Sequence, residues 1–133
     1  MRVFLDTSVL VAAFATRGLC ADVLRTVLAE HELVVGETVL AELGRVLKEK
    51  IGTPEAQARD VVAFVRQHAL VAAETPVPAI DVRDANDLPI LAGAIQGGAE
   101  VLVTGDEDLL VLGRVESLPI RDPRGFWDLI KGR

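Results

Sequence analysis

Short runs of apolar residues alternate along this chain with longer segments in which apolar residues recur every three or four positions. The short runs predict buried strands at residues 2–5, 33–35, 70–73, 101–103 and 118–120. The longer segments predict helices at residues 19–29, 37–51, 54–68, 87–95 and 123–130, and residues 7–13 are expected to form a short helical or turn segment. Strands that alternate with helices predict a parallel sheet covered on both faces, which is a three-layer α/β/α sandwich.

Prolines add two expectations to this pattern. Pro119 lies in the last predicted strand and has no backbone N–H, so we expect that strand at an edge of the sheet. Pro76 and Pro78 predict an irregular loop over residues 74–86. The chain has no internal repeat or linker, and 50% of its residues are hydrophobic, so we expect a single globular domain spanning residues 1–133.

The chain contains no apolar run of the ~18 residues that a membrane span needs. Its first residues already follow a strand pattern rather than that of a signal peptide, so we expect a cytoplasmic protein without a membrane partner. Cys20 is the only cysteine, which excludes an intrachain disulfide. It lies on an apolar helix face and is interpreted as a small core residue.

The formal net charge is −6 at pH 7. Nucleic-acid-binding proteins are usually basic, because contacts to phosphate supply much of the affinity. The charge therefore argues against a nucleic-acid partner. That argument weakens where acidic side chains cluster around bound divalent cations, because the cations reverse the local field.

Two of the predicted strands are followed by an aspartate. Asp6 follows the first strand, and Asp106 follows the fourth strand after a Thr-Gly turn. Ligands of open α/β sheets bind outside the carboxyl ends of the strands, so the two aspartates face each other if these strands are neighbours. Glu42 lies at the edge of a helical apolar stripe and Asp87 lies in the first turn of a helix. Both are therefore candidates to close the sides of an acidic site.

Clustered carboxylates cannot all remain ionised without a counter-charge. The four positions offer oxygen ligands without His or Cys, which favours Mg²⁺ or Mn²⁺ over zinc. The chemistry that fits such a site is metal-assisted hydrolysis of phosphodiester bonds. Singly, each acid also has a structural interpretation as a helix cap, a turn residue or a solvated helix residue. These interpretations do not explain why two central strands both end in aspartate.

Four segments that carry these acids resemble the acidic motifs of PIN domains: Leu5-Asp6-Thr7-Ser8-Val9-Leu10, Val39-Leu40-Ala41-Glu42-Leu43, Asp87-Leu88-Pro89-Ile90-Leu91-Ala92 and Val103-Thr104-Gly105-Asp106-Glu107-Asp108-Leu109. The likeness spans nearly the whole chain, in the family's order and spacing. It implies a five-stranded parallel sheet of order 3-2-1-4-5 and a Mg²⁺- or Mn²⁺-dependent endoribonuclease that acts on single-stranded or structured RNA. Many small prokaryotic members are toxins of VapBC-like toxin–antitoxin pairs, usually dimeric, so the resemblance also implies a cognate antitoxin and a homodimer.

Motif matching assigns roles to individual residues. It implies that the catalytic and metal-binding acids are Asp6, Glu42, Asp87 and Asp106. It implies supporting hydroxyls at Ser8 and Thr104. The chain departs from the usual four acids by adding Asp84 and Asp108, which are candidate outer metal ligands, and Leu109-Leu110 replaces a commoner aromatic residue.

Other families with an aspartate after the first strand fit less well. A haloacid-dehalogenase-type phosphatase needs a second aspartate where Ser8 stands, and a Rossmann domain needs a glycine-rich turn there. A receiver domain needs an acceptor aspartate after the third strand, where Glu74 stands, and a late lysine, whereas Lys131 lies in the terminal helix. The remaining alternative is a catalytically weak PIN-like module that binds RNA or protein.

Contact with RNA phosphates in an acidic protein must be local. The candidate residues are Arg17, Arg45, Arg83 and Arg114. Each of them, taken singly, is also an ordinary solvated arginine.

Overall fold

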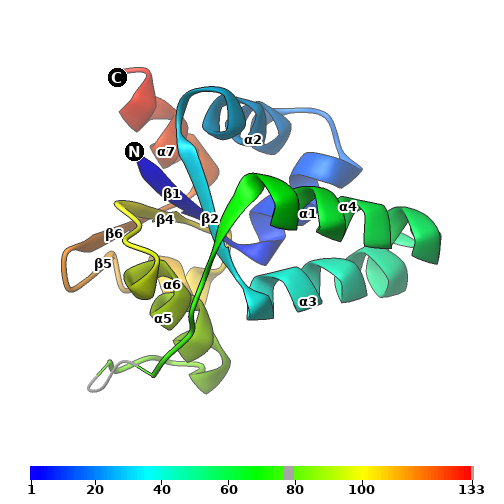
Figure 1. The fold of residues 1–133 in the computed structure, drawn as a ribbon. Helices are drawn as coiled ribbons and strands as arrows, with labels where there is room; N and C mark the ends of the chain where they lie inside the picture. Colours follow the sequence, from blue (N-terminus) through cyan, green and yellow to red (C-terminus); the bar gives the residue numbers. More distant parts are fainter. Residues whose placement is uncertain (77–79, 133) are drawn as a thin grey trace.

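Within residues 1–76 and 80–132, which the computed structural model describes, six strands form one central sheet (Figure 1). They are β1 (Arg2–Leu5), β2 (Glu32–Gly36), β3 (Ala69–Ala72), β4 (Val101–Val103), β5 (Arg114–Val115) and β6 (Leu118–Arg121). Their order is β3-β2-β1-β4-β6-β5, with parallel neighbours except for the antiparallel pair β5–β6. Pro78 and its neighbours in the predicted loop lie outside the described residues.

The predicted α/β/α fold and the order of its five main strands are confirmed, and the sheet gains one short antiparallel strand. The expected edge position of the last main strand is wrong, because β6 lies between β4 and β5. Pro119 is tolerated there because β6 pairs with β4 only through Ile120 and Arg121, while Pro119 stands opposite Arg114 of β5. The missing N–H therefore removes no bond to the central strand.

The helices follow the predicted segments closely, except for a short helix at residues 107–110 that was not predicted. The α-helices are α1 (Thr7–Ala15), α2 (Leu19–Glu30), α3 (Glu37–Val46), α4 (Glu55–His68), α5 (Leu88–Gln96), α6 (Glu107–Leu110) and α7 (Pro123–Ile130). A π-helical turn, η1 (Leu47–Ile51), extends α3, and a 3₁₀ turn, η2 (Ala85–Asp87), leads into α5. Gly52 ends η1 in the left-handed conformation at φ 80°, which a glycine adopts without strain.

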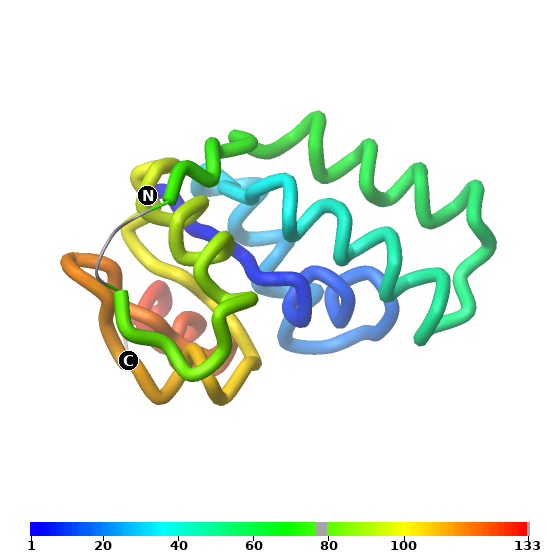
Figure 2. The backbone as a smooth tube through the Cα atoms, turned by 90° about the horizontal axis from the view of Figure 1, so that it is seen from below, coloured from blue at the N-terminus to red at the C-terminus, as the bar shows by residue number. Residues whose placement is uncertain are grey.

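Helices α2 and α7 cover one face of the sheet and α5 covers the other (Figure 1). This burial on both faces explains why the strands are continuous apolar runs. In β1, the side chains of Val3, Phe4 and Leu5 are all fully buried. Helices α3 and α4 form a hairpin that extends away from the sheet (Figure 2).

A carboxylate from the segment after β3 caps helix α3. Gly36 precedes α3 and provides no side-chain cap. Instead, Glu74 accepts hydrogen bonds from the Thr38 backbone N–H at 3.2 Å and from its hydroxyl at 2.8 Å. A Cβ atom at position 36 would lie 2.4 Å from Glu74 Oε2, so the glycine makes room for this remote cap.

Among the described residues, no helix is by itself long and apolar enough to cross a membrane. The pair α1 and α2 meets the requirement only when the two are taken together, across a bend of 104°.

Candidate metal centre

The pairing of β1 with β4 brings two of the predicted acids to one edge of the sheet. Leu5 stands opposite Val103, and the Asp6 backbone N–H donates to the Val103 carbonyl at 3.0 Å. Asp6 then begins α1, where its Oδ1 accepts from the Thr7 N–H at 2.8 Å. Asp106 begins α6 and accepts from the Asp108 N–H at 3.0 Å. Both acids thus cap helices, and the capping leaves their remaining oxygen lone pairs available for a ligand.

Thr104 joins these two acids. Its fully buried hydroxyl donates to Asp6 Oδ2 at 2.7 Å and accepts from the Asp106 backbone N–H at 3.0 Å. The Thr104 N–H itself is held by the Arg121 carbonyl of β6 at 3.0 Å. The predicted supporting hydroxyl therefore fixes the orientation of Asp6 and the backbone position of Asp106.

Glu42 and Ser8 are tied to the same framework. Glu42 lies on α3 and accepts a hydrogen bond from the Thr7 hydroxyl of α1 at 3.0 Å. The Ser8 hydroxyl accepts from the Gly105 N–H at 3.1 Å and so holds the turn before Asp106. Thr7 was not singled out in the sequence, although its place after Asp6 at the start of a helix was the available signal.

Asp87 differs from Asp6, the other buried acid, because its carboxylate accepts no hydrogen bond from the described residues. It is 7% exposed, and its Oδ2 is buried without any partner among the described residues. Burial, with added repulsion from Asp106, Asp84, Asp6 and Asp108, raises the pKa of Asp87 to about 7. A buried carboxylate without a partner is costly to keep charged, so this position favours a bound proton or a bound cation.

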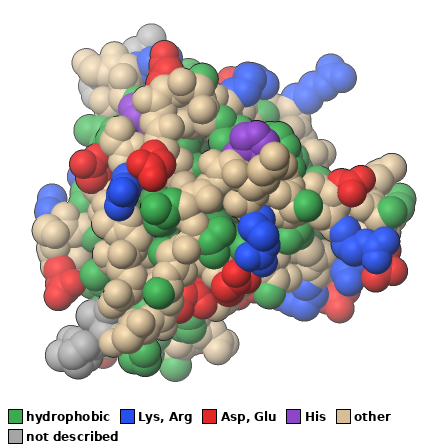
Figure 3. Space-filling model, viewed as in Figure 1, with side chains coloured by type: hydrophobic (Ala, Val, Ile, Leu, Met, Phe, Trp, Pro, Cys, Tyr) green, Lys and Arg blue, Asp and Glu red, His purple; other side chains and the backbone are tan. Residues whose placement is uncertain are grey.

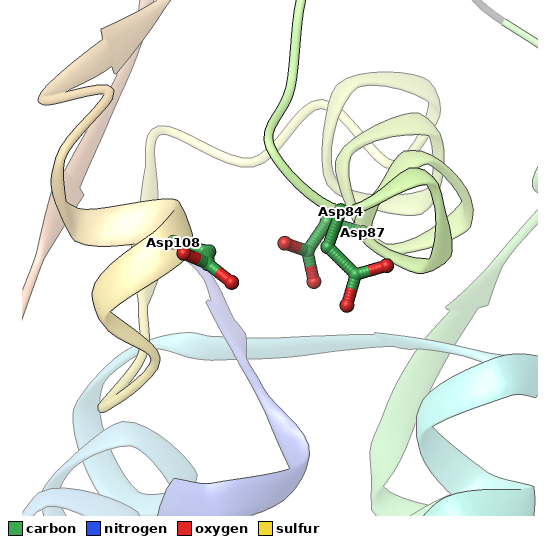
Figure 4. A group of neighbouring side chains, drawn as sticks. All are labelled: Asp84, Asp87 and Asp108. Atoms are coloured by element: carbon green, nitrogen blue, oxygen red, sulfur yellow. The ribbon is translucent and has the colours of Figure 1, made fainter.

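Asp84, Asp87 and Asp108 form the tightest acidic group in the described part of the chain. One ligand atom from each lies within 4.8 Å of the other two. In Figure 4, Asp84 and Asp87 come from the turn before α5 and lie across from Asp108 at the start of α6. The two added acids of the sequence therefore lie beside a predicted central ligand.

The acids line a cleft of about 720 Å³. Five of the six predicted acids line this cleft: Asp6, Glu42, Asp84, Asp87 and Asp106. Asp108 does not line it and makes an ion pair with Arg83 at 3.5 Å. Sequence reasoning missed four polar lining residues: Thr7, Thr16, Lys50 in the π-helical turn and Asn86 beside Asp87.

The electrostatics and donor set of this cleft fit a hard cation. Burial raises the pKa of Asp6, and the nearby Glu42 and Asp106 carboxylates raise it further, while hydrogen bonds from Thr104 and Thr7 lower it. All the acidic side chains offer oxygen ligands, which suit Mg²⁺ or Mn²⁺. Asp84, Asp87 and Asp108 are the acids whose ligand atoms lie within 4.8 Å of one another, while Asp6, Glu42 and Asp106 line the cleft without being part of that group. That Asp6, Glu42, Asp87 and Asp106 hold the ion stays a prediction.

The four candidate arginines lie in different places. Arg45 lines the acidic cleft, and Arg17 follows Thr16, another lining residue. Arg83 is paired with Asp108. Arg114 lies on β5 and donates to the Ser117 carbonyl at 3.4 Å. Two of the four, Arg45 and Arg83, are thus in or next to the acidic group.

A family model for the PIN domain matches residues 2–108. The chain belongs to the PIN-domain family. The matched segment includes all six acids and both supporting hydroxyls. A search of curated proteins found no match.

Solved structures confirm the PIN-like fold at low sequence identity. A chain of the crystal structure of VapBC2 from Rickettsia felis, bound to a DNA fragment from their promoter, is similar with a TM-score of 0.64 and 18% identity, covering 92% of this chain and 98% of that one. A chain of VapBC-1 from nontypeable Haemophilus influenzae has a TM-score of 0.61 and 20% identity, covering 93% and 99%.

Proposed function

We propose that this PIN domain is a Mg²⁺- or Mn²⁺-dependent endoribonuclease. The observation that carries the proposal is Asp87, whose buried carboxylate oxygen has no protein partner and faces a group of further carboxylates. A purely structural aspartate at a helix start would be satisfied by backbone N–H groups, as Asp122 is at α7 through the Gly125 N–H at 2.7 Å. Asp87 lacks that bond, which supports a role toward a cation.

Hydrogen bonds within the chain hold the acidic side chains of the cleft in position for this chemistry. When bound, a divalent cation activates water and stabilises negative charge on the phosphate and the leaving oxygen. Thr104 holds Asp6 in one orientation, and Thr7 holds Glu42 across from it. Asp6 and Asp106 leave neighbouring strands of the rigid sheet, so their separation is fixed before a substrate arrives.

We further propose that the substrate is single-stranded or structured RNA and that the protein is the toxin of a cytoplasmic toxin–antitoxin pair, bound by a cognate antitoxin and forming a homodimer. The support is the likeness in fold to chains of two VapBC structures together with membership of the PIN family.

The test is cleavage of a labelled single-stranded RNA in Mn²⁺ and in EDTA. We expect cleavage only with the cation, and no cleavage by an Asp87→Asn variant that remains folded. Asp60→Asn, an exposed aspartate on α4, is the matched control and should cleave as the wild type does. RNA binding without cleavage in any divalent cation would instead assign the chain to the binding-module alternative.

A further inference from the structure

The acidic cleft has a second end that carries no carboxylate. The acids gather around the start of α1, and the lining then continues along both α1 and α3, as far as Thr16 after α1 and Ile51 of η1. Small and aliphatic side chains line the walls in between: Val11, Ala12 and Val46. A metal ion and its oxygen ligands occupy only part of a cleft of about 720 Å³, because each water-sized ligand takes about 30 Å³. The rest of the cleft is available to a substrate.

Lys50 is the cation of this second end whose charge no carboxylate balances. Among the described residues, the cations that line the cleft are Arg45 and Lys50. Arg45 pairs with Glu49 at 3.2 Å, whereas Lys50 is exposed and makes no ion pair within residues 1–76 and 80–132. Figure 3 shows basic side chains at the outer end of the hairpin that α3 and α4 form. An unbalanced ammonium at the end of the cleft attracts a negatively charged group.

The π-helical turn η1 brings Lys50 into the cleft. In a regular α-helix, each four-residue step turns about 40° beyond a full turn, so Lys50 would lie about 80° around the axis from Glu42. Hydrogen bonds of a π-helix span five residues, and the wider turn takes back part of that rotation. In η1, the Gly52 N–H donates to the Leu47 carbonyl, five residues earlier. Lys50 therefore lines the same cleft as Glu42, whereas Lys48 of the same turn lines a separate hollow between α3 and α4.

We propose that Lys50 binds a backbone phosphate of the RNA substrate away from the scissile bond, so that the strand runs from the acids along α1 and η1. This inference rests on the proposed function, because it takes the acids as the place of cleavage. The helical rise from Glu42 to Lys50 is about 12 Å. One nucleotide of a strand advances about 3.4 Å or more, so the bound phosphate lies within about three nucleotides of the scissile phosphate, on one side of it.

The lining predicts that this subsite recognises the backbone and not the base. Single-stranded nucleic acid is usually held by bases that stack on aromatic side chains, and no aromatic residue lines the cleft in the part of the chain that the structure describes. The Thr16 hydroxyl at this end already donates to the Ala12 carbonyl at 2.6 Å, so its proton is not offered to a base. A lysine ammonium, in contrast, suits phosphate as a point charge. Affinity at this nucleotide should therefore depend on its phosphate charge.

The first test measures binding of a short single-stranded RNA to the uncleaving Asp106→Asn protein in Mn²⁺, by fluorescence anisotropy. Adding Lys50→Met should weaken binding by about three- to tenfold and lower the salt slope by about 0.7, because one phosphate contact is lost. Lys50→Arg keeps the charge and should retain most of the affinity. The matched control is Lys48→Met, which changes an exposed lysine of the same turn that does not line the cleft. Equal affinities for Lys50→Met and Lys48→Met would overturn the proposal.

The second test locates the bound phosphate. Single phosphates of the same RNA are replaced, one at a time, by uncharged methylphosphonate. One replacement, within about three nucleotides of the cleavage position, should weaken binding as much as Lys50→Met does and should have no further effect once Lys50 is replaced. Removal of the base at that nucleotide should change the affinity less. A fully additive effect, the absence of a sensitive phosphate, or a larger effect of base removal would each contradict the proposal.

Cleavage by the wild type separates failure of this inference from failure of the proposed function. Where RNA is cleaved, Lys50→Met should raise KM and leave kcat nearly unchanged, because Lys50 does not contact the reacting phosphate. A lower kcat at unchanged KM would place Lys50 at the reacting group and refute the proposal. If RNA binds through Lys50 but is not cleaved in Mn²⁺, the nuclease function fails and phosphate binding by Lys50 stands. A protein that binds no RNA would overturn both.

Discussion

Asp6 and Asp87 are both 7% exposed and line the same cleft, but their surroundings differ. Both oxygens of Asp6 accept hydrogen bonds, from the Thr7 N–H and the Thr104 hydroxyl. Asp87 has a buried oxygen without a partner. The two hydrogen bonds offset part of the cost of burying the Asp6 charge, although burial still raises its pKa, whereas the buried oxygen of Asp87 has no such compensation. Asp87 therefore depends more strongly than Asp6 on a bound proton or cation.

The largest expected effect is on activity. Asp6→Asn, Glu42→Gln, Asp87→Asn and Asp106→Asn should each reduce RNA cleavage by at least about a hundredfold, because each removes a proposed ligand. Asp84→Asn and Asp108→Asn should reduce it only partly, and more at low cation concentration. The measurement is the cleavage rate of all six variants against Mn²⁺ concentration.

The order of these effects is itself informative. If Asp84→Asn were inactive at saturating Mn²⁺ while Asp87→Asn stayed active, Asp84 and not Asp87 would be the essential metal ligand of this turn. Circular dichroism of each variant confirms that loss of cleavage is not loss of fold.

The second prediction concerns pH in the metal-free protein. The folded-state pKa of Asp87 is raised from 3.8 to about 7, so the folded state binds the proton more tightly than the unfolded state. The free energy of unfolding should therefore fall as pH rises between these values, by on the order of 4 kcal/mol. Urea unfolding in EDTA at several pH values measures it.

Asp87→Asn separates this contribution from the others. The variant cannot lose a proton at that position, so its stability should fall less than that of the wild type over the same pH interval. Asp6 also has a raised pKa and adds a fall of the same sign. Parallel curves for the wild type and Asp87→Asn would contradict the difference drawn between the two aspartates.

The third prediction concerns the stability that a bound divalent cation adds to the folded protein. A ligand that binds only the folded state raises the free energy of unfolding by about 2.7 kcal/mol at 100 times its Kd. The melting temperature should therefore be higher in Mn²⁺ than in EDTA, and most of this rise should be lost in Asp6→Asn and in Asp87→Asn. Identical melting curves in the two buffers would argue strongly against a metal centre.

A smaller effect on stability is expected at Thr104, which is hydrogen-bonded to both Asp6 and Asp106. Thr104→Val removes the hydroxyl between Asp6 and Asp106 and should lower the free energy of unfolding by about 1–2 kcal/mol, because two buried polar groups lose a partner. Thr104→Ser keeps the hydroxyl and should lower it less. Chemical denaturation of both variants above pH 8 checks this prediction.

The smallest expected effect is on RNA binding by individual arginines. Arg45→Glu and Arg83→Glu should weaken binding to an uncleaving Asp106→Asn protein, because both residues lie in or beside the acidic group. Each lost phosphate contact should lower the salt slope by about 0.7. Arg114→Glu, on β5 and outside the lining of the acidic cleft, should have less effect. Equal losses of RNA binding at all three positions would contradict this prediction, because a position beside the acidic group would then make no difference.

The sequence predicted the main strands and helices because buried parallel strands are continuous apolar runs and the helices have clear apolar stripes. It missed β5, which has only two residues and turns into β6 at Glu116 and Ser117. Glu116 adopts φ 53° there, where Asn or Gly is usual, so no turn signal was present.

Only part of the candidate site could be predicted from the sequence. The positions after strands placed Asp6 and Asp106 together, since strand ends are fixed by the sheet. The distance between Asp84, Asp87 and Asp108 and the missing partner of Asp87 depend on how loops fold back, which no local pattern encodes. The same holds for the place of Lys50 in the cleft, which depends on a π-helical turn.

The remote cap on α3 links two positions that are far apart in the sequence. Glu74 reaches the start of α3 past position 36, which has no side chain. During divergence of the family, a larger residue at 36 would push the flexible carboxylate of residue 74 away from Thr38 and so weaken this cap. Relatives that retain one of the two are therefore expected to retain the other, and a relative that changes position 36 should have replaced the cap with a residue beside α3 itself.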